Sequence, residues 1–467
     1  MDHSKRQRLT GQVKRFCGRF AQGAGAALGR VIPQHCLLQW LKEEAGDYRE
    51  RIYDPLQTLA LFIEQVLGAD HSCQDAVARG MSQRVALGQS PCSLNNGPYC
   101  KARARLALNL IERLGREVGE RLRAAQPEVW RWRGREVKLI DGTTVSMPDT
   151  AANQAEYPQS RTQQPDLGFP LMRLVAIISL SCGAVLEWAT GPCKGKRTGE
   201  TAMLWQLAHR MRPGDVVIAD RYFSGYFLLA WLIRHGVDVV VRQHQLRHTD
   251  FCRGRQLGAK DHVVTWARPA RPSWMDEATY TIMPESLILR EAQVDGLILV
   301  TTLIDARQVS KRELLGLYHA RWHIELDLRS IKTVMQMDVL RCKSPAMVKK
   351  EIAVHLLAYN LVRAVMAQSA FLGHVLPRQL SFKAALQLIC AFEENLRHAP
   401  QERMILRRTY LLAGIAQVRL HHRPDRVEPR AVKRRTQQHP LMTRPRHILR
   451  TELLKQRQAR HEEGLIR

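Results

Sequence analysis

The order of apolar segments between residues 131 and 345 is the feature that most constrains the fold of this 467-residue chain. Short apolar runs of strand length alternate there with segments of helical periodicity. The first such segment, 135–149, is predicted to form a strand, a turn and a second strand. The strand-like segments that follow it in the chain are 169–180, 184–190, 214–220, 237–243 and 297–304. Helical patterns lie near 199–212 and 224–236 and after the last strand. This order predicts an α/β fold in which helices cover both faces of a mixed sheet.

The regions on either side of this segment are predicted to be helical. Residues 1–130 carry helical periodicity without strand signals, and residues 346–425 have the same character. Residues 426–467 form a basic tail, and we expect its proline-punctuated part, 426–450, to be an extended arm rather than a packed element. Within the α/β segment, residues 244–296 are rich in Thr, Arg and isolated aromatics, and we interpret them as an inserted β subdomain.

The net charge indicates a polyanionic partner. Lys and Arg number 71 and Asp and Glu 44, so a formal charge of +27 is spread over both flanks and the middle. This excess favours nucleic acid over a membrane surface. A soluble protein that is simply basic, or one associated with ribosomes, is the alternative.

Neither the apolar runs nor the cysteines indicate an exported or membrane protein. The longest candidate for a membrane span, 171–189, is interrupted by polar residues. Its uninterrupted apolar runs are shorter than the roughly 18 residues that a membrane span needs. The ten cysteines form no C-x-x-C pair or zinc-like spacing with histidine, so we expect reduced thiols. These features predict a cytoplasmic protein.

Residues 318–332, YHARWHIELDLRSIK, place four functional groups together. At about 100° per residue, Tyr318, Arg321, Glu325 and Lys332 fall within roughly 60° of one another on a helix. A neighbouring apolar stripe would dock this helix on the sheet. An array of i, i+4 ion pairs is the alternative explanation of the charged residues.

Two aspartates follow apolar strands. Asp141 ends the predicted strand VKLID and Asp220 ends VVIAD, the position at which open α/β sheets carry functional groups. Either aspartate could instead be a turn or cap residue. Together with Glu325, however, they would supply the carboxylate oxygens that two divalent metal ions require for phosphoryl displacement. Tyr318, Arg321 and Lys332 would then hold a DNA backbone against the metals.

The spacing Tyr318-x2-Arg321-x3-Glu325-x6-Lys332 resembles the Y-R-E-K signature of the insertion-sequence-four family of DDE transposases. The stretches IDGTTVSMPD, ADRYF, YCKARARL and PRAVKRR are also similar to this family, so the resemblance covers most of the chain. In YCKARARL, the basic residues Lys101, Arg103 and Arg105 open a helix, where they suit either phosphate contact or a solvated face.

The resemblance implies a ribonuclease-H-like catalytic domain with Asp141, Asp220 and Glu325 as a catalytic triad that binds two divalent ions, Mg²⁺ or Mn²⁺. It also implies metal-dependent cut-and-paste transposition through hairpin ends, by a nucleoid-associated bacterial protein that acts as a homodimer on two DNA ends. By the same resemblance, Tyr318, Arg321 and Lys332 contact phosphates near the cleaved end, and the amino-terminal helices bind the terminal inverted repeat.

The chain departs from the family at one strand. Well-studied members carry a tryptophan in the late insertion strand that stacks on a flipped base, whereas 297–304 contains none. Trp266 and Trp274 lie earlier in the insertion, where they could form an aromatic platform or belong to the subdomain core.

Other catalytic motifs do not fit. The segment GPCKGKRTGE at 191–200 is too short between its glycines for a phosphate-binding loop, and Arg197 stands where Ser or Thr is needed. Two rival functions remain: a metal-dependent DNA nuclease of the same fold without strand transfer, and a non-catalytic DNA-binding inhibitor of transposition.

Overall fold

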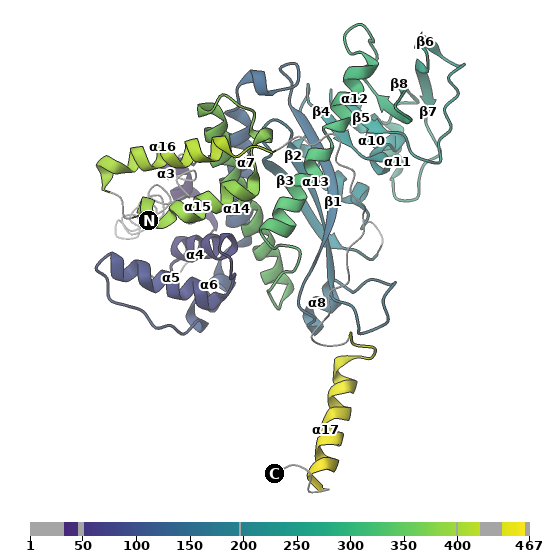
Figure 1. Cartoon of the computed structure of the whole chain (residues 1–467). Coiled ribbons are helices and arrows are strands. Elements are labelled where there is room, and N and C mark those ends of the chain that lie inside the picture. Colours follow the sequence, from purple (N-terminus) through teal and green to yellow (C-terminus); the bar gives the residue numbers. More distant parts are fainter. Residues whose placement is uncertain (1–31, 45–50, 196–197, 398–399, 421–440, 463–467) are drawn as a thin grey trace.

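Figure 1 shows a computed structural model of the chain, which describes residues 32–44, 51–195, 198–397, 400–420 and 441–462. Helices from before and after the α/β segment gather on one side of a long twisted sheet. The fold class is mixed α/β, as the alternation of apolar segments predicts.

Five helices precede the sheet in the described residues: α3 (Gln34–Glu44), α4 (Pro55–Leu67), α5 (Cys73–Ala86), α6 (Gly97–Arg105) and α7 (Leu108–Ala124). The carboxylate of Asp54 accepts the backbone N–H of Gln57 and so caps α4, whose next residue, Pro55, suits the first turn.

The basic residues of α6 do not share one solvated face. Lys101 and Arg105 are exposed, but Arg103 is buried with its guanidinium 3.9 Å from the Phe62 ring centroid. Its Nη1 and Nη2 atoms donate to the sulfur atoms of Cys73 and Cys342. The prediction of an exposed position is therefore wrong for Arg103, because α6 packs this side of the helix against α4.

One continuous sheet of nine strands runs through the molecule in the order β3-β2-β1-β4-β5-β9-β8-β7-β6. The strands are β1 (Val137–Ser146), β2 (Leu171–Ser179), β3 (Val185–Pro192), β4 (Val216–Ala219), β5 (Asp238–Arg242), β6 (Arg255–Gly258), β7 (Asp261–Ala267), β8 (Ser286–Val294) and β9 (Leu297–Thr301). Strands β1, β4 and β5 pair in parallel, and the other neighbours pair antiparallel. Strands of the inserted segment thus extend the central sheet through β9.

The prediction of a turn within 135–149 is wrong. Residues 137–146 form the single strand β1, because β2 pairs with it without interruption from Lys138 opposite Ser179 to Ser146 opposite Leu171. The Gly-Thr-Thr sequence that resembles a turn is held extended by this partner strand.

Short helices connect the strands: α8 (Ala151–Glu156), α9 (Glu200–Leu207), α10 (Tyr226–Arg234) and α11 (Glu277–Thr281). After the last strand, β9, the chain continues into α12 (Lys311–His319), α13 (Trp322–Arg329) and a π-helical turn, η4 (Ser330–Val334). Of the predicted residues, Tyr318 lies in α12, Glu325 in α13 and Lys332 in η4, and Arg321 lies in the turn between α12 and α13.

The long helix α14 (Pro345–Leu372) forms the centre of the helical body, and most of its residues are buried. Its Asn360 side chain donates to the carbonyl oxygens of Gly115 and Val185 and accepts the N–H of Val185, which ties α14 to α7 and β3. A Cβ atom at Gly119 would lie 2.2 Å from the Val185 carbonyl oxygen, so only glycine allows this approach of α7 to β3.

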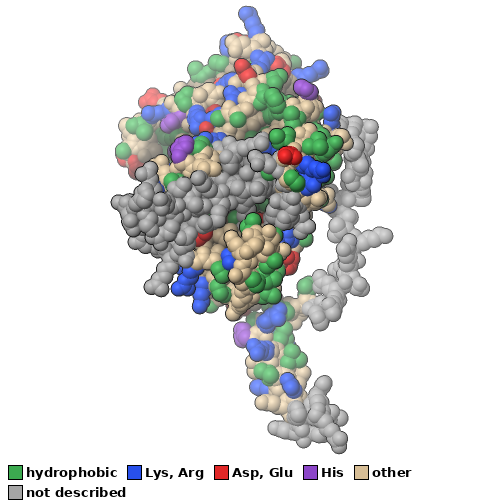
Figure 2. Space-filling view, turned by 90° about the vertical axis from the view of Figure 1, so that its left-hand side faces the viewer, with side chains coloured by type: hydrophobic (Ala, Val, Ile, Leu, Met, Phe, Trp, Pro, Cys, Tyr) green, Lys and Arg blue, Asp and Glu red, His purple; other side chains and the backbone are tan. Residues whose placement is uncertain are grey.

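Two helices, α15 (Phe382–Arg397) and α16 (Gln401–Gln417), complete the helical body. The stretch PRAVKRR lies outside the described residues. The prediction of an extended arm over 426–450 is wrong at its end, because α17 (Arg446–Glu462) begins there. Figure 2, viewed from the helical side, shows Lys and Arg side chains along α17, which stands apart from the rest of the molecule. None of the helices in the described parts of the chain combines the length and apolar character needed to cross a bilayer.

Candidate active site

Residues 318–332 do not form the single helix that their periodicity predicts. Helix α12 ends at His319, and the N–H groups of Arg321 and Ile324 bond to carbonyls three residues back, which makes a tight turn before α13. The segment then passes from α13 into the π-helical turn η4. Because both changes alter the rotation per residue, the arrangement of the side chains depends on the three-dimensional contacts rather than on a helical wheel.

The first two predicted acids, Asp141 and Asp220, lie beside each other where the parallel pairing of two neighbouring strands ends. Parallel pairing of β1 with β4 ends near Leu139 opposite Ile218. Asp141 lies two residues after Leu139, in the middle of β1, and Asp220 lies two residues after Ile218, just beyond β4. Asp141 therefore does not end its strand as predicted, but it lies where the neighbouring strand ends.

Asp220 also caps the turn that follows β4. Its carboxylate accepts the backbone N–H of Tyr222 at 2.8 Å. The alternative reading of Asp220 as a cap residue is thus correct, although capping leaves its second carboxylate oxygen available for other ligands.

Arg321 connects the third predicted acid to the first. Its guanidinium lies 2.7 Å from Oε1 of Glu325 and 3.6 Å from Oδ2 of Asp141. The expected i, i+4 ion pair therefore exists, but it is part of a contact that joins α13 to β1. Asp141 and Glu325, which are 184 positions apart in the sequence, are brought to the same cation.

The surroundings of Asp141 disfavour the charged form of its carboxyl group. Its pKa is raised from 3.8 to about 6, mainly by burial and in smaller part by the nearby carboxylates of Asp220 and Glu200. A hydrogen bond from the Gly142 N–H and the charge of Arg321 act in the opposite direction. The net effect is that the charged form of Asp141 is less favourable in the folded protein than in water.

The remaining two predicted residues lie on either side of this group. Lys332 donates from Nζ to the Thr143 hydroxyl at 3.0 Å, two residues along β1 from Asp141. Tyr318 is buried, and burial raises its pKa while Arg321 and Arg242 lower it. The structure thus brings Lys332, Arg321 and both strand-associated acids to one edge of the sheet.

Two acidic residues near the site were not predicted. Glu200, the first residue of α9, approaches β1 at Gly142. Asp327 is fully buried on α13, where Arg378 donates to both of its carboxylate oxygens at 2.7 Å and Arg363 donates to one. The sequence offers little signal for Glu200, but an aspartate between Leu326 and Leu328 is a pattern that suggests a buried partner.

The donor atoms suit a divalent metal ion, although they are not gathered around one point. No group of three or more His, Cys, Asp or Glu side chains in the described parts of the chain is close enough to surround one ion. Carboxylate oxygens are nevertheless the ligands that Mg²⁺ and Mn²⁺ prefer. The guanidinium of Arg321 already places a positive charge between Asp141 and Glu325. The carboxylates thus suit a divalent ion by their chemistry, while in this structure Arg321 lies between Asp141 and Glu325.

The insertion tryptophans differ in accessibility. Trp266 is buried in β7, with its indole N–H donating to Glu291 at 2.7 Å and the Arg247 guanidinium 3.4 Å from its ring centroid. It belongs to the core of the insertion. Trp274 is about half exposed and packs beside Phe227, so of the two it is the one with an open ring surface.

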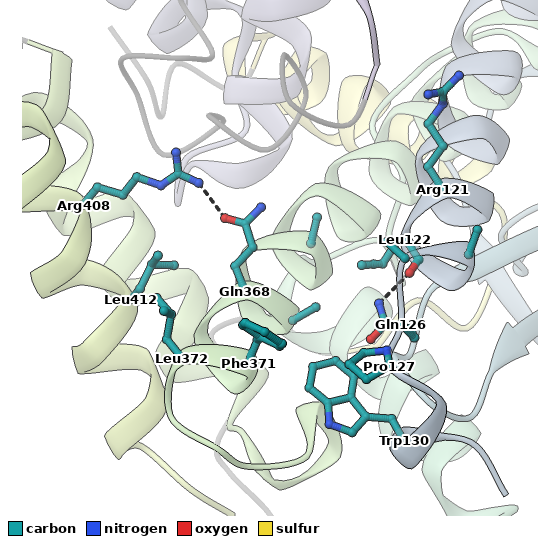
Figure 3. A pocket seen from close by; sticks show the side chains of 14 residues that line it. Arg121, Leu122, Gln126, Pro127, Trp130, Gln368, Phe371, Leu372, Arg408 and Leu412 are labelled. Atoms are coloured by element: carbon teal, nitrogen blue, oxygen red, sulfur yellow. Dashed lines mark hydrogen bonds between the residues drawn. The ribbon is translucent and has the colours of Figure 1, made fainter. Parts of the chain in front are cut away.

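A separate cavity of about 800 Å³ lies in the helical body, between α7, α14 and α16 (Figure 3). Trp130, Phe371 and Leu412 give it an apolar lining, and Arg408 donates to Gln368 at its rim. None of the predicted site residues lines this cavity.

Comparison with known proteins identifies the class of the domain that contains these acids. A family model described as "Transposase DDE domain" matches residues 132–361, which include β1, β4, α13 and all six predicted site residues. The matched domain is that of a DDE transposase.

A curated relative identifies the family. The chain is 30% identical over 353 residues to "Transposase InsG for insertion sequence element IS4" of Escherichia coli (strain K12), an alignment that covers 70% of this chain and 76% of the relative. This chain belongs to the insertion-sequence-four (IS4) family of DDE transposases.

A structural comparison finds the "Cryo-EM structure of piggyBac transposase synaptic complex with hairpin DNA (SNHP)". The TM-score is 0.43 and the sequence identity 10%, with 88% of each chain covered.

Proposed function

We propose that this transposase excises its own insertion sequence at the terminal inverted repeats and joins it to target DNA in a metal-dependent cut-and-paste reaction. Asp141, Asp220 and Glu325 form the catalytic triad. The observation that carries this proposal is the convergence of Asp141 and Glu325 on one cation, with Asp220 at the same edge of the sheet.

The core of the enzyme is proposed to be ribonuclease-H-like. The strand order β3-β2-β1-β4-β5 supports this, since three antiparallel strands are followed by two that run parallel to β1. The parallel strands end where the acids lie, which is the position of functional groups in open α/β sheets.

Two divalent ions, Mg²⁺ or Mn²⁺, would be held by the carboxylates of the triad. When bound, such ions activate the attacking oxygen and stabilise the leaving oxygen of an in-line phosphoryl displacement. The protein holds the negatively charged ligands in place before the ion arrives, with the Gly142 N–H and Arg321 limiting their repulsion.

Tyr318, Arg321 and Lys332 are proposed to bind DNA phosphates near the cleaved end. Lys332 is anchored by a neutral hydroxyl, so its charge is not cancelled by that contact. Arg321 would exchange the Asp141 carboxylate for a phosphate when metal binds, because both are anions that suit a guanidinium. The formal charge of +27 supports tight binding of the DNA backbone.

The amino-terminal helices are proposed to bind the terminal inverted repeat, and two protomers to act on paired ends. If the reaction proceeds through a hairpin, Trp274 is the better placed of the two insertion tryptophans to stack on a flipped base, because its ring is half exposed.

A donor plasmid that carries the gene and its native flanking DNA tests the proposal. Wild type is expected to release the element and insert it elsewhere. Glu325→Gln should abolish excision but retain binding to the flanks, because the change removes one carboxylate charge without removing a DNA-binding cation. Glu402→Gln, which alters an exposed glutamate on α16, is the control and should remain active.

The rival functions give different products in the same assay. Cut ends without joined products would indicate a nuclease without strand transfer. Flank binding without products from either protein would indicate a non-catalytic inhibitor.

A further inference from the structure

Arg242, the last residue of β5, lies in line with two of the proposed catalytic acids. The parallel pairing of β1, β4 and β5 aligns three residues in a row across the sheet: Leu139, Ile218 and Val240. Asp141, Asp220 and Arg242 each follow a member of this row by two residues. Because side chains two residues apart on a strand point to the same face, the next row across the sheet consists of two acids and one arginine.

Arg242 shares the face of the sheet that carries the other proposed DNA contacts. Helix α12, which ends with Tyr318 and His319, packs against β5 (Figure 1). Burial raises the pKa of Tyr318 and Asp220 adds to this effect, whereas Arg321 and Arg242 act in the opposite direction. Arg242 is therefore close to Tyr318, on the same face as Arg321.

The guanidinium group of Arg242 has no partner among the residues that the structure describes. No described carboxylate lies within 4.0 Å of it, and no described group accepts a hydrogen bond from it. Arg321, in contrast, is bonded to Glu325. Since Arg242 is only partly buried, its five N–H donors are accessible to a ligand that approaches from solvent.

The backbone at the end of β5 is held in place from its other side. Strand β9 pairs with Arg242, and the N–H of Gln243 bonds to the carbonyl oxygen of Ile298 at 2.9 Å. The buried side chain of Gln243 donates to the carbonyl oxygen of Arg247 and accepts the hydroxyl of Thr249, both at 2.6 Å. Only the side chain of Arg242 therefore has to become ordered when a ligand binds.

Arg242 and Lys332 lie on different sides of the aligned acids. Lys332 contacts Thr143 on β1, whereas Arg242 belongs to β5, and β4 lies between these two strands. Adjacent strands are about 4.8 Å apart, so β1 and β5 are separated by about 10 Å. A DNA strand with its scissile phosphate over Asp141 and Asp220 would pass Lys332 on one side and Arg242 on the other.

We propose that Arg242 binds the DNA backbone on the β5 side of the scissile phosphate, at a phosphate other than the one that Lys332 binds. This inference rests on the proposed transposase function. A guanidinium group can donate two parallel hydrogen bonds to one phosphate, which fixes the direction of the strand as well as its position. The strand that is cut then crosses the ends of β1, β4 and β5 in that order.

Neutralising single phosphates of the DNA tests this contact. Duplexes would contain the end of the element, each with one uncharged methylphosphonate near the cleavage point, and their binding to the full chain would be measured with a chelator present. Wild type should lose about tenfold in affinity at each phosphate that a cationic side chain contacts. Arg242→Ala should lose about as much on the unmodified duplex, and methylphosphonate at one of these positions should cause it no further loss.

Arg307→Ala is the matched control. Arg307 is exposed and follows β9, which runs antiparallel to β5, so it lies at the other end of the strands. Its variant should respond to every methylphosphonate as wild type does. Arg242→Gln, which keeps most of the side chain but removes the charge, decides the question if Arg242→Ala does not fold.

The possible results separate this inference from the proposed function. Equal responses of wild type and Arg242→Ala at every position would overturn the contact and make Arg242 a solvated cation. If Arg242→Ala and Lys332→Ala became insensitive at the same phosphate, the path of the strand would be overturned. Failure of wild type to release the element from the donor plasmid would instead contradict the proposed function itself.

Discussion

Asp141 and Asp327 are both largely buried, but the protein treats their charges differently. Asp327 is inaccessible to solvent and is surrounded by the guanidinium groups of Arg363 and Arg378. Asp141 keeps 19% of its side chain exposed, has one guanidinium at 3.6 Å, and lies near two other carboxylates. The first environment pairs the buried carboxylate with two guanidinium groups, whereas the second places one guanidinium and two further carboxylates near it.

The difference separates a structural acid, Asp327, from the proposed catalytic acid, Asp141. Arg378 also donates to the carbonyl oxygens of Ser179 and Leu180, so Asp327 fixes α13 against the end of β2. Glu325, two residues earlier on the same helix, is thereby held over β1. Asp327 is a positioning residue, and its stability contribution supports the geometry of the site.

The largest expected effect comes from breaking the compensated pair. Asp327→Asn should destabilise the protein by about 3–5 kcal/mol, because it leaves two buried guanidinium groups without a negative partner. Urea unfolding of the full chain measures this loss. Asp166→Asn is the control, since Asp166 lies in an exposed turn whose positive φ asparagine also tolerates. A loss below about 1 kcal/mol would show that the network contributes little.

Asp141→Asn should have the opposite sign. In metal-free buffer at neutral pH, it should stabilise the protein by about 2–3 kcal/mol, because it removes a carboxylate whose ionised form is disfavoured. The folded protein holds the Asp141 proton more tightly than the unfolded chain does, so wild-type stability falls as pH rises from about 4 through about 6.

This gain should therefore disappear near pH 4, where wild-type Asp141 is also uncharged. Unfolding curves at several pH values, recorded with a chelator, measure the difference. Equal stability of the two proteins at all pH values would mean that the charge of Asp141 is already compensated, as that of Asp327 is.

The smallest expected effect concerns a cation. Lys332 is anchored to a neutral hydroxyl, unlike Arg363, which is paired with Asp327. Lys332→Ala should weaken binding of the cleaved DNA end by about 1 kcal/mol and reduce the salt dependence by about one charge.

Binding at several salt concentrations tests this, with Lys383→Ala on α15 as a control that removes an exposed lysine from the helical body. An unchanged salt slope for Lys332→Ala would argue against a phosphate contact.

Several elements were predictable because their signals are local. The apolar patterns at 54–67, 109–126 and 349–368 correspond to α4, α7 and α14. The alternation of strands and helices predicts the α/β class, and the Y-R-E-K spacing points to the family that the comparisons identify.

Other features could not be predicted because they depend on partners far away in the sequence. Strand β1 passes through Gly142 without turning because β2 pairs with it throughout. Arg103 has the sequence context of an exposed cation, but α6 buries it against Phe62. Residues 318–332 have one helical period, but their backbone changes geometry twice.

The sequence by itself determined the fold class, the family and the residues proposed to carry the chemistry, because periodicity and motif spacing are properties of neighbouring residues. The tertiary structure decided which acids meet. Asp141 and Asp220 are aligned by the pairing of β1 with β4, and Arg321 joins Asp141 to Glu325. Charges interact through distances in space, and only the folded chain brings these residues within reach of one another.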